Sequence, residues 1–231
     1  MSEFAYIGEN LLRVREDCAR IAQRLGVGMP SLLAVTKSAT AEEVASLVRE
    51  HGQAMIAENR TSLFCERYEM FADAERPEMH LIGQLQTNKV KYIAGKTALI
   101  HSLDSERLCA EIEKQAARRD IVMRVLIEIN SAEEDAKGGI RPADALAFAE
   151  AVLSYPHIKL SGVMTMGPVL AEREAYRPYF RETARIYRML IERGYMGEDA
   201  VLSMGMSGSY AVAVEEGANM IRVGRGLFVK Q

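Results

Sequence analysis

Short apolar runs rich in branched residues alternate with helical patterns along the whole sequence, and this alternation limits the folds that the chain can adopt. Eight runs are candidates for strands: Leu32–Val35, Ala54–Ala57, Met79–Ile82, Ala98–Ile100, Val122–Ile129, Leu160–Met164, Val201–Ser203 and Met220–Val223. Strands that alternate with helices form parallel sheets, because each parallel pair requires a long crossover connection. Eight such units close into a barrel, so we predict an α/β protein with a (β/α)8 TIM barrel.

A helix precedes the first of these runs. Apolar residues recur there at steps of three and four and Gly26 follows the last of them, which predicts an amphipathic helix with a glycine end. Its apolar stripe is Phe4, Ile7, Leu11, Val14, Cys18, Ile21 and Leu25. Further along, Thr40 and Glu43 have the spacing of a capping box, and Pro178 suits the first turn of another helix. No linker interrupts the chain, so we assign residues 1–231 to one domain with an extra N-terminal helix.

The composition excludes several classes of protein. With 48% hydrophobic and 26% charged residues, the chain is globular and not disordered. Its formal net charge of -3 is opposite to the basic surface of a nucleic-acid-binding protein. Three widely spaced cysteines match no metal signature and suit a reducing compartment, and no apolar run is long enough to span a membrane. We therefore expect a cytoplasmic protein without nucleic-acid, membrane or metal partners, and we take it to be a monomer.

A lysine follows the first predicted strand, at the end where barrels of this kind place their functional residues. Lys37 comes directly after the apolar run and Thr36. An ammonium group at the mouth of an apolar barrel is partly desolvated, which lowers the pKa of the amine and makes it a nucleophile toward carbonyl groups. A structural lysine, with its stem on the rim and its charge in water, would occupy the same position.

The ends of the last two predicted strands carry small residues that suit a phosphate group. The segment from Ser203 to Ser209 leads into a short helical stretch, so backbone N–H groups there are free to bind an anion. Gly224-Arg225-Gly226 follows the eighth strand, and phosphate sites of this fold are commonly built from these two loops. Strand alternation places Arg222 on the inner face, where its charge needs a ligand or an acid.

Together these features indicate a phosphorylated carbonyl compound with an aromatic ring. A lysine able to form a Schiff base, a phosphate cradle and an inward arginine fit pyridoxal 5′-phosphate (PLP). The spacing of the residues does not distinguish PLP from a sugar phosphate.

Seven segments, in order, resemble the pyridoxal phosphate homeostasis protein family, whose members are similar to the amino-terminal barrel of alanine racemase standing alone. The resemblance covers nearly the whole chain and implies the barrel called fold type III among PLP-binding proteins. The segments are Leu33–Lys37, Glu58-Asn59, His80–Lys89, His101–Asp104, Val163–Met166, Ser203–Gly208 and Ile221–Gly224.

This resemblance also implies which residues bind the cofactor, with none assigned to catalysis or to a metal. Lys37 forms the Schiff base, Arg222 faces the pyridine nitrogen, and the loops after the last two strands hold the phosphate. The implied cofactor-binding residues are Lys37, Asn59, Ser207, Gly208, Arg222, Gly224 and Arg225. Because an arginine stays protonated, the ring nitrogen that faces it remains unprotonated and PLP is a poor electron sink. The implied function is intracellular PLP (vitamin B6) homeostasis, as a buffer or carrier that supplies apo-enzymes without robust catalysis.

The sequence departs from the family pattern at three positions near this site. Ala57 stands where a glycine is usual, and Ser209 stands where an aspartate is common. Arg225 replaces a small hydroxyl residue that would offer its side chain to the phosphate. Two roles are open for Arg225: its guanidinium pairs with the phosphate, or it swings away and leaves only its N–H group there.

Two other functions would use the same lysine. An amino-acid racemase needs a base on each face of the substrate carbon, and in two-domain racemases an extra β-domain helps to supply one of them as a tyrosine. Only Gly224 to Gln231 follow the eighth strand, so we expect no such domain. A Schiff-base aldolase would act on a sugar phosphate, and the sequence shows no evident acid–base partner for that reaction. A racemase and an aldolase are thus the alternatives to a carrier, and weak racemisation is compatible with a carrier.

Overall fold

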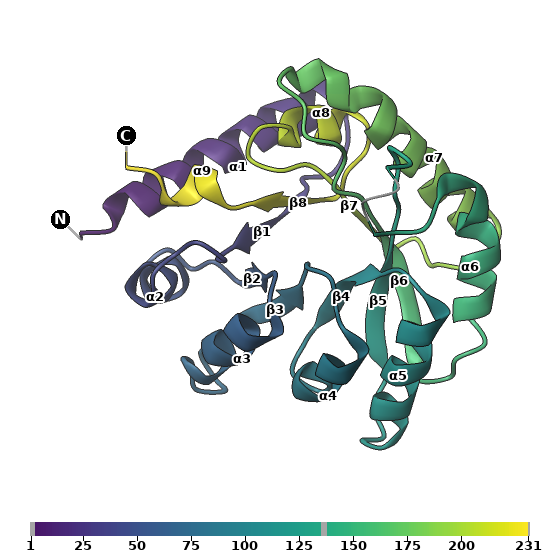
Figure 1. The fold of residues 1–231 in the computed structure, drawn as a ribbon. Coiled ribbons are helices and arrows are strands. Elements are labelled where there is room, and N and C mark those ends of the chain that lie inside the picture. The colour runs from purple at the N-terminus through teal and green to yellow at the C-terminus, as the bar shows by residue number, and fades with distance from the viewer. Residues whose placement is uncertain (1–2, 135–137, 231) are drawn as a thin grey trace.

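The computed structural model describes residues 3–134 and 138–230, whose parallel strands close into a barrel in chain order (Figure 1). The strands are β1 (Ser31–Val35), β2 (Met55–Glu58), β3 (Glu78–Leu81), β4 (Leu99–Leu103), β5 (Met123–Glu128), β6 (Ile158–Met164), β7 (Val201–Ser203) and β8 (Met220–Val223). β1 pairs with β8, so the sheet has no free edge. The predicted (β/α)8 barrel is confirmed.

The largest difference from the predicted strands is at β4. The apolar run predicts an end at Ile100, whereas the strand continues through His101 and Ser102 to Leu103. Both polar side chains are fully buried, and polar residues interrupt the apolar pattern by which a buried strand is detected. His101 is therefore part of the barrel wall and not of the loop at its rim.

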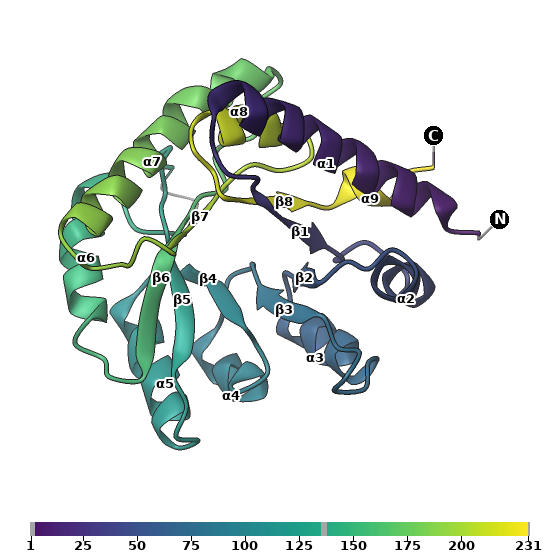
Figure 2. The ribbon, with the colours of Figure 1, turned by 180° about the vertical axis from the view of Figure 1, so that it is seen from behind.

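Helices follow the strands and cover the outside of the barrel (Figures 1 and 2). They are α2 (Ala41–Arg49), α3 (Thr61–Glu69), α4 (Val90–Ile93), α5 (Glu106–Ala117), α6 (Ala145–Val152), α7 (Arg177–Glu192), α8 (Tyr210–Glu215) and α9 (Arg225–Phe228), with 3-10 turns at Thr87–Lys89, Pro142–Asp144 and Arg173–Tyr176. The capping box of Thr40 and Glu43 begins α2, and Pro178 lies in the first turn of α7, both as predicted. In the described part of the chain, every helix is too short or too polar to cross a lipid bilayer.

The predicted N-terminal helix is α1 (Ala5–Leu25), which ends at Gly26 in the left-handed conformation with φ 66°. It lies beside α8 and α9 in both views (Figures 1 and 2). Because α8 has only six residues, the apolar stripe of α1 supplies additional surface over this side of the barrel. The Asn10 side chain donates to the carbonyl groups of Leu227 and Val229, which ties the first helix to the last segment.

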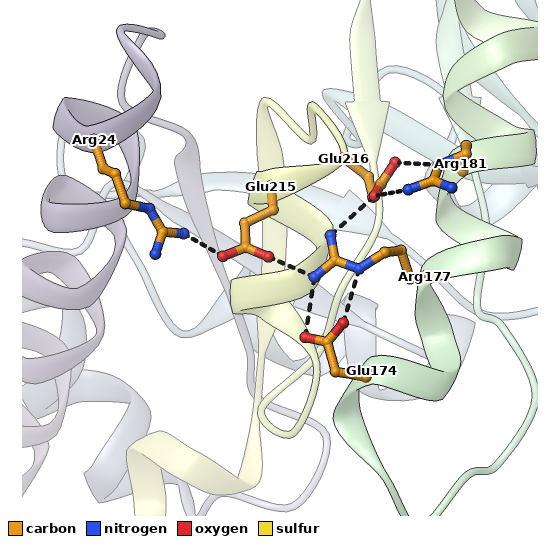
Figure 3. A network of polar contacts seen from close by, with 6 residues as sticks. All are labelled: Arg24, Glu174, Arg177, Arg181, Glu215 and Glu216. Atoms are coloured by element: carbon orange, nitrogen blue, oxygen red, sulfur yellow. Dashed lines mark hydrogen bonds and ion pairs between the residues drawn. The ribbon is translucent and has the colours of Figure 1, made fainter.

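An ion-pair network holds α8 between α1 and α7 (Figure 3). Glu215 pairs with Arg24 of α1 and with Arg177 of α7. Glu216, directly after α8, pairs with Arg177 at 2.9 Å and with Arg181 at 3.0 Å. Because one arginine serves several carboxylates, less side-chain entropy is lost for each pair than in isolated surface pairs. The network therefore fixes the short helix that follows the β7 loop.

The inside of the barrel is partly apolar and partly polar. One cluster of apolar side chains comes mainly from β1, β2 and β8, and a second cluster comes from β4, β5 and β6. Polar side chains complete the interior, each with no more than 1% of its surface exposed: His80, His101, Ser203 and Arg222. Buried polar groups are costly unless they are hydrogen-bonded, so these four residues need one another or a ligand.

A buried carboxyl group also packs on the outer side of the barrel. Glu58 of β2 is fully buried, accepts a hydrogen bond from the Thr36 hydroxyl and lies 3.8 Å from Nε of Arg67 in α3. Its second oxygen has no hydrogen-bond partner among the described residues. Burial raises the pKa of Glu58 to about 7, although Thr36 and Arg67 both favour the charged form.

We predict that Glu58 makes the protein less stable as the pH rises. Its pKa of about 7 in the folded protein lies above the ordinary value of 4.5. Between these two pH values the folded state therefore binds more protons than the unfolded state. The free energy of unfolding should fall by on the order of 3 kcal/mol as the pH rises through this range. Urea unfolding at several pH values should show a steeper loss of stability with rising pH in the wild type and in the exposed control Glu69→Gln than in Glu58→Gln. Equal slopes in all three proteins would contradict the prediction.

Candidate functional site

A cavity of about 320 Å³ opens at the carboxyl ends of β1, β7 and β8, a volume within the range of small-molecule sites. Val35, Ile82, Met166 and Met206 contribute apolar wall. Six of the seven residues implied by the resemblance also line it: Lys37, Ser207, Gly208, Arg222, Gly224 and Arg225. The fold thus brings the lysine near the N-terminus together with the loops near the C-terminus.

Asn59, the seventh residue, lies outside this cavity. It lines a neighbouring cavity together with Arg60, Cys65 and Lys89. Its backbone approaches Gly83 so closely that a Cβ on this glycine would lie 2.1 Å from the Asn59 carbonyl oxygen. Asn59 therefore shapes the ends of β2 and β3, and its contact with a cofactor stays a prediction.

Lys37 lies at the rim of the cavity and is exposed to solvent. The sequence led us to expect an amine partly withdrawn from water, whereas β1 ends at Val35 and the chain turns at Lys37 and Ser38, where the lysine is exposed. Among the residues that the structure describes, no carboxylate forms an ion pair with Lys37. The amine is thus accessible both to a ligand in the cavity and to water.

Hydrogen-bond donors collect where the β7 and β8 loops meet. The backbone N–H groups of Ser207, Gly208 and Arg225 bond to no other described residue, and all three residues line the cavity. The Ser207 hydroxyl accepts a hydrogen bond from Gly226 N–H at 3.1 Å, which joins the two loops and leaves its own proton free to donate. A Cβ on Gly208 would meet no atom within 4 Å, so the space beside it is open. Backbone N–H groups, a hydroxyl and a guanidinium suit a phosphate group.

The β7 loop is held in this shape by its own residues. Ser209, at the position where the family commonly has an aspartate, is buried and accepts a hydrogen bond from Met206 N–H at 3.1 Å. Gly205 has φ 88°, and a Cβ there would lie 2.5 Å from Cβ of Ala213 in α8. Only glycine satisfies both the left-handed conformation and this close approach.

The Arg222 side chain points into the barrel, as strand alternation predicts. Nη1 donates to the Ser203 hydroxyl and Nη2 donates to the Thr165 carbonyl, both at 2.8 Å. Burial lowers the pKa of Arg222 to about 10, while the charge of Glu128 acts in the opposite direction, so the guanidinium stays charged at neutral pH. Nη2 also lies 3.6 Å from the Met166 sulfur. Within the described residues the direct partners of the guanidinium are thus neutral atoms, so of the two partners expected from the sequence, a ligand or an acid, the ligand remains open.

Tyr176 is a cavity residue that the sequence did not reveal. Its hydroxyl accepts a hydrogen bond from Leu170 N–H at 3.1 Å and lies 3.4 Å from the Leu170 carbonyl oxygen. Its ring lies against Gly167 and stacks on Phe180. Tyr176 therefore holds the loop after β6 against the cavity. The sequence pattern assigned Tyr176 to the apolar face of a helix, so it gave no sign of a role at the cavity.

Glu128 is a second residue that the sequence did not reveal. It lines a cavity of about 390 Å³ that shares Met166, Tyr176 and Arg225 with the first cavity. Burial raises the pKa of Glu128 to about 7, with a smaller contribution from Asp104. A carboxyl group at the end of an apolar strand is the signal that could have found it.

The fold is a (β/α)8 barrel, and its cavity combines the Lys37 amine, the buried Arg222 and a group of N–H donors from the β7 and β8 loops. This combination is typical of barrels that bind phosphorylated carbonyl compounds. The family model of the alanine racemase N-terminal domain matches residues 10–231. The pyridoxal phosphate homeostasis protein of Aquifex aeolicus is 41% identical over 225 residues, which cover 95% of this chain and 96% of that protein. The chain therefore belongs to the pyridoxal phosphate homeostasis proteins within the alanine racemase N-terminal domain family, which confirms the resemblance.

Solved structures agree with this assignment. PipY of Synechococcus elongatus PCC7942, determined with PLP bound, superposes with a TM-score of 0.83 at 25% identity, covering 96% of this chain and all (100%) of that one. Alanine racemase of Clostridium difficile 630 superposes with a TM-score of 0.73, covering 94% of this chain and 59% of the racemase. At 16% identity, the second likeness shows the fold alone.

We predict that two glycines of the β7 loop respond oppositely to alanine. Gly205→Ala should destabilise the protein by about 1–3 kcal/mol or more, because the left-handed backbone and the contact with Ala213 both oppose a Cβ. Gly208→Ala should change stability by less than about 0.5 kcal/mol, because its Cβ points into open space. Thermal and urea unfolding of both variants measure the difference, and similar losses would show that the loop is held in another way.

Proposed function

We propose that the protein holds PLP as a Schiff base on Lys37 and serves in intracellular PLP (vitamin B6) homeostasis as a buffer and carrier. The observation that carries the proposal is the cavity that joins Lys37, Arg222 and the β7 and β8 loops. Relatives named pyridoxal phosphate homeostasis protein and the PipY structure with PLP bound support it. Condensation of the Lys37 amine with the PLP aldehyde forms one C=N bond and releases one water, so the linkage is reversible.

The cavity offers a different protein group to each part of PLP. In our proposal Lys37 takes the aldehyde, and the donors of Ser207, Gly208 and Arg225 bind the phosphate. Gly224 keeps the β8 loop close to β1, since a Cβ there would lie 3.2 Å from the Val35 carbonyl oxygen. Arg222 faces the ring nitrogen and, being charged at neutral pH, keeps this nitrogen unprotonated. PLP in this setting withdraws electrons weakly.

The same site favours holding and release over catalysis. Racemisation needs a base on each face of the substrate carbon, and in the described part of the chain Tyr176 is the tyrosine that lines the cavity. Its hydroxyl is engaged with the backbone of Leu170, so it is poorly placed to remove a proton. Because Lys37 is exposed, water and amines can reach the C=N bond, which suits transfer to apo-enzymes of PLP. One chain supplies the cavity, so in this proposal a monomer of one domain, residues 1–231, is sufficient.

We expect the protein loaded with PLP to be yellow and to lose this colour with borohydride. The reduced adduct should lie on the peptide that contains Lys37, because among the described residues this is the lysine that lines the cavity. Lys37→Ala should lose the visible absorption and the transfer of PLP to an apo-enzyme, whereas the exposed control Lys91→Ala should keep both. An adduct on another peptide, or full colour in Lys37→Ala, would refute the proposal.

Two assays separate the proposed carrier from the alternatives. A colourless protein that cleaves aldol substrates would favour a Schiff-base aldolase. Interconversion of added D- and L-amino acids at enzyme-like rates would favour a racemase.

We further propose that the Arg225 guanidinium binds the phosphate, since it is exposed at the cavity and forms no ion pair with any described residue. Arg225→Thr should raise the dissociation constant for PLP about tenfold at low salt, which corresponds to about 1.4 kcal/mol for one charge-assisted contact, and less at high salt. Fluorescence or absorption titration measures the change. Arg60→Thr, at the neighbouring cavity, is the matched control. An unchanged constant in Arg225→Thr would leave only the N–H group of Arg225 at the phosphate.

A further inference from the structure

A chain of buried polar side chains crosses the inside of the barrel from the cavity to the opposite end. Arg222 Nη1 lies 2.8 Å from Ser203 Oγ, Ser203 Oγ lies 3.2 Å from His101 Nδ1, and His101 Nε2 lies 2.9 Å from His80 Nδ1. Each of these residues is at most 1% exposed. His80 Nε2 in turn lies 3.7 Å from the Glu78 carboxylate, at the first residue of β3 and therefore at the amino ends of the strands.

The protons in this chain can be placed because the Arg222 guanidinium can only donate. Ser203 accepts from Arg222, and its own proton has one remaining acceptor among the described residues, Nδ1 of His101. A neutral His101 with an accepting Nδ1 carries its proton on Nε2, which donates to Nδ1 of His80. His80 then carries its proton on Nε2, on the side of the Glu78 carboxylate.

The opposite direction leaves one buried proton without an acceptor and places a lone pair toward a carboxylate. If His80 donated to His101 and His101 donated to Ser203, the buried hydroxyl proton of Ser203 would have no acceptor. His80 Nε2 has no hydrogen-bond partner among the described residues in either order, but the opposite order would turn its lone pair, and not a proton, toward the Glu78 carboxylate. Burial is the main cause that lowers the pKa of His101 well below its usual range, which favours the neutral ring that the first direction requires.

We propose that this one-way hydrogen-bond chain positions Arg222 for the ring nitrogen of PLP, with His80 and His101 as positioning residues. Ser203 and the Thr165 carbonyl hold Nη1 and Nη2 and so fix the plane of the guanidinium. Because these partners are neutral, they hold the side chain without cancelling its positive charge at the cavity. The role toward the ring depends on the proposed function, whereas the order of the protons depends only on atoms of the protein.

The proposed direction of the hydrogen bonds is tested in the protein without PLP, by measuring which ring nitrogen of His80 and of His101 carries the proton. The chain has four histidines, and long-range proton–nitrogen NMR of nitrogen-labelled wild type should show His80 and His101 neutral, with the proton on Nε2 and a bare Nδ1. The Nδ1 signal of His101 should shift in Ser203→Ala, which removes the donor, and return in Ser203→Thr, which restores a hydroxyl. A proton on Nδ1 of His101 in the wild type would overturn the proposal, and this measurement requires no variant to fold.

PLP labelled with nitrogen-15 in its ring tests the positioning role. The ring signal should remain that of an unprotonated pyridine near neutral pH in the wild type and in Ser203→Thr. In Ser203→Ala it should move toward the protonated form as the pH falls, because Arg222 has lost one of its anchors. Ser161→Ala is the matched control, since Ser161 is a buried barrel serine that accepts from Arg124 and lies outside the chain.

The possible failures are distinguishable. An identical ring signal in Ser203→Ala and the wild type would overturn the positioning role and leave PLP binding intact. A wild-type protein that binds no PLP would refute the proposed function together with the role toward the ring, while the tautomers would still decide the order of the protons.

Discussion

The positive charge of Arg222 inside the barrel is the constraint on which the site depends. A buried charge is costly unless hydrogen bonds satisfy it, and here the partners come from β7 and from Thr165 after β6. Ser203 in turn lies within hydrogen-bond distance of His101, and His101 of His80, so both rings fill the centre of the barrel. Barrels of this kind usually fill their centre with aliphatic side chains. Here a row of hydrogen-bonded polar side chains fills it, and the guanidinium of Arg222 forms a positively charged wall of the cavity.

Closure of the sheet brings the remaining groups to this wall. β8 pairs with β1 on one side and with β7 on the other, so the carboxyl ends that carry Lys37, the β7 loop and the β8 loop are neighbours. The helices that follow these last strands are short, and they are held from outside, by the apolar stripe of α1 and by the arginines of α1 and α7. The N-terminal helix is therefore a structural requirement of a site built near the other end of the chain.

The exposure of Lys37 bears directly on the proposed carrier function. A buried amine would gain nucleophilicity through desolvation, whereas an exposed one keeps its linkage open to water and to competing amines. The Tyr176 hydroxyl is engaged with Leu170 and holds the loop after β6. An accessible amine and an engaged tyrosine hydroxyl are the two features of the site that support the proposed carrier over a racemase.

Periodicity in the sequence was sufficient for the barrel, the extra helix and the inward direction of Arg222, because these follow from local patterns of apolar and polar residues. The motifs likewise identified six of the residues that line the cavity. Contacts between distant strands were beyond such reasoning: the hydrogen bond between His80 and His101, the second cavity beside Glu128 and the role of Tyr176 depend on the register of β3, β4, β5 and the loop after β6. The rim position of Lys37 also required the structure, since the turn after β1 decides its exposure. Chain pattern determines which face a residue occupies, and only tertiary packing decides which other residue it meets there.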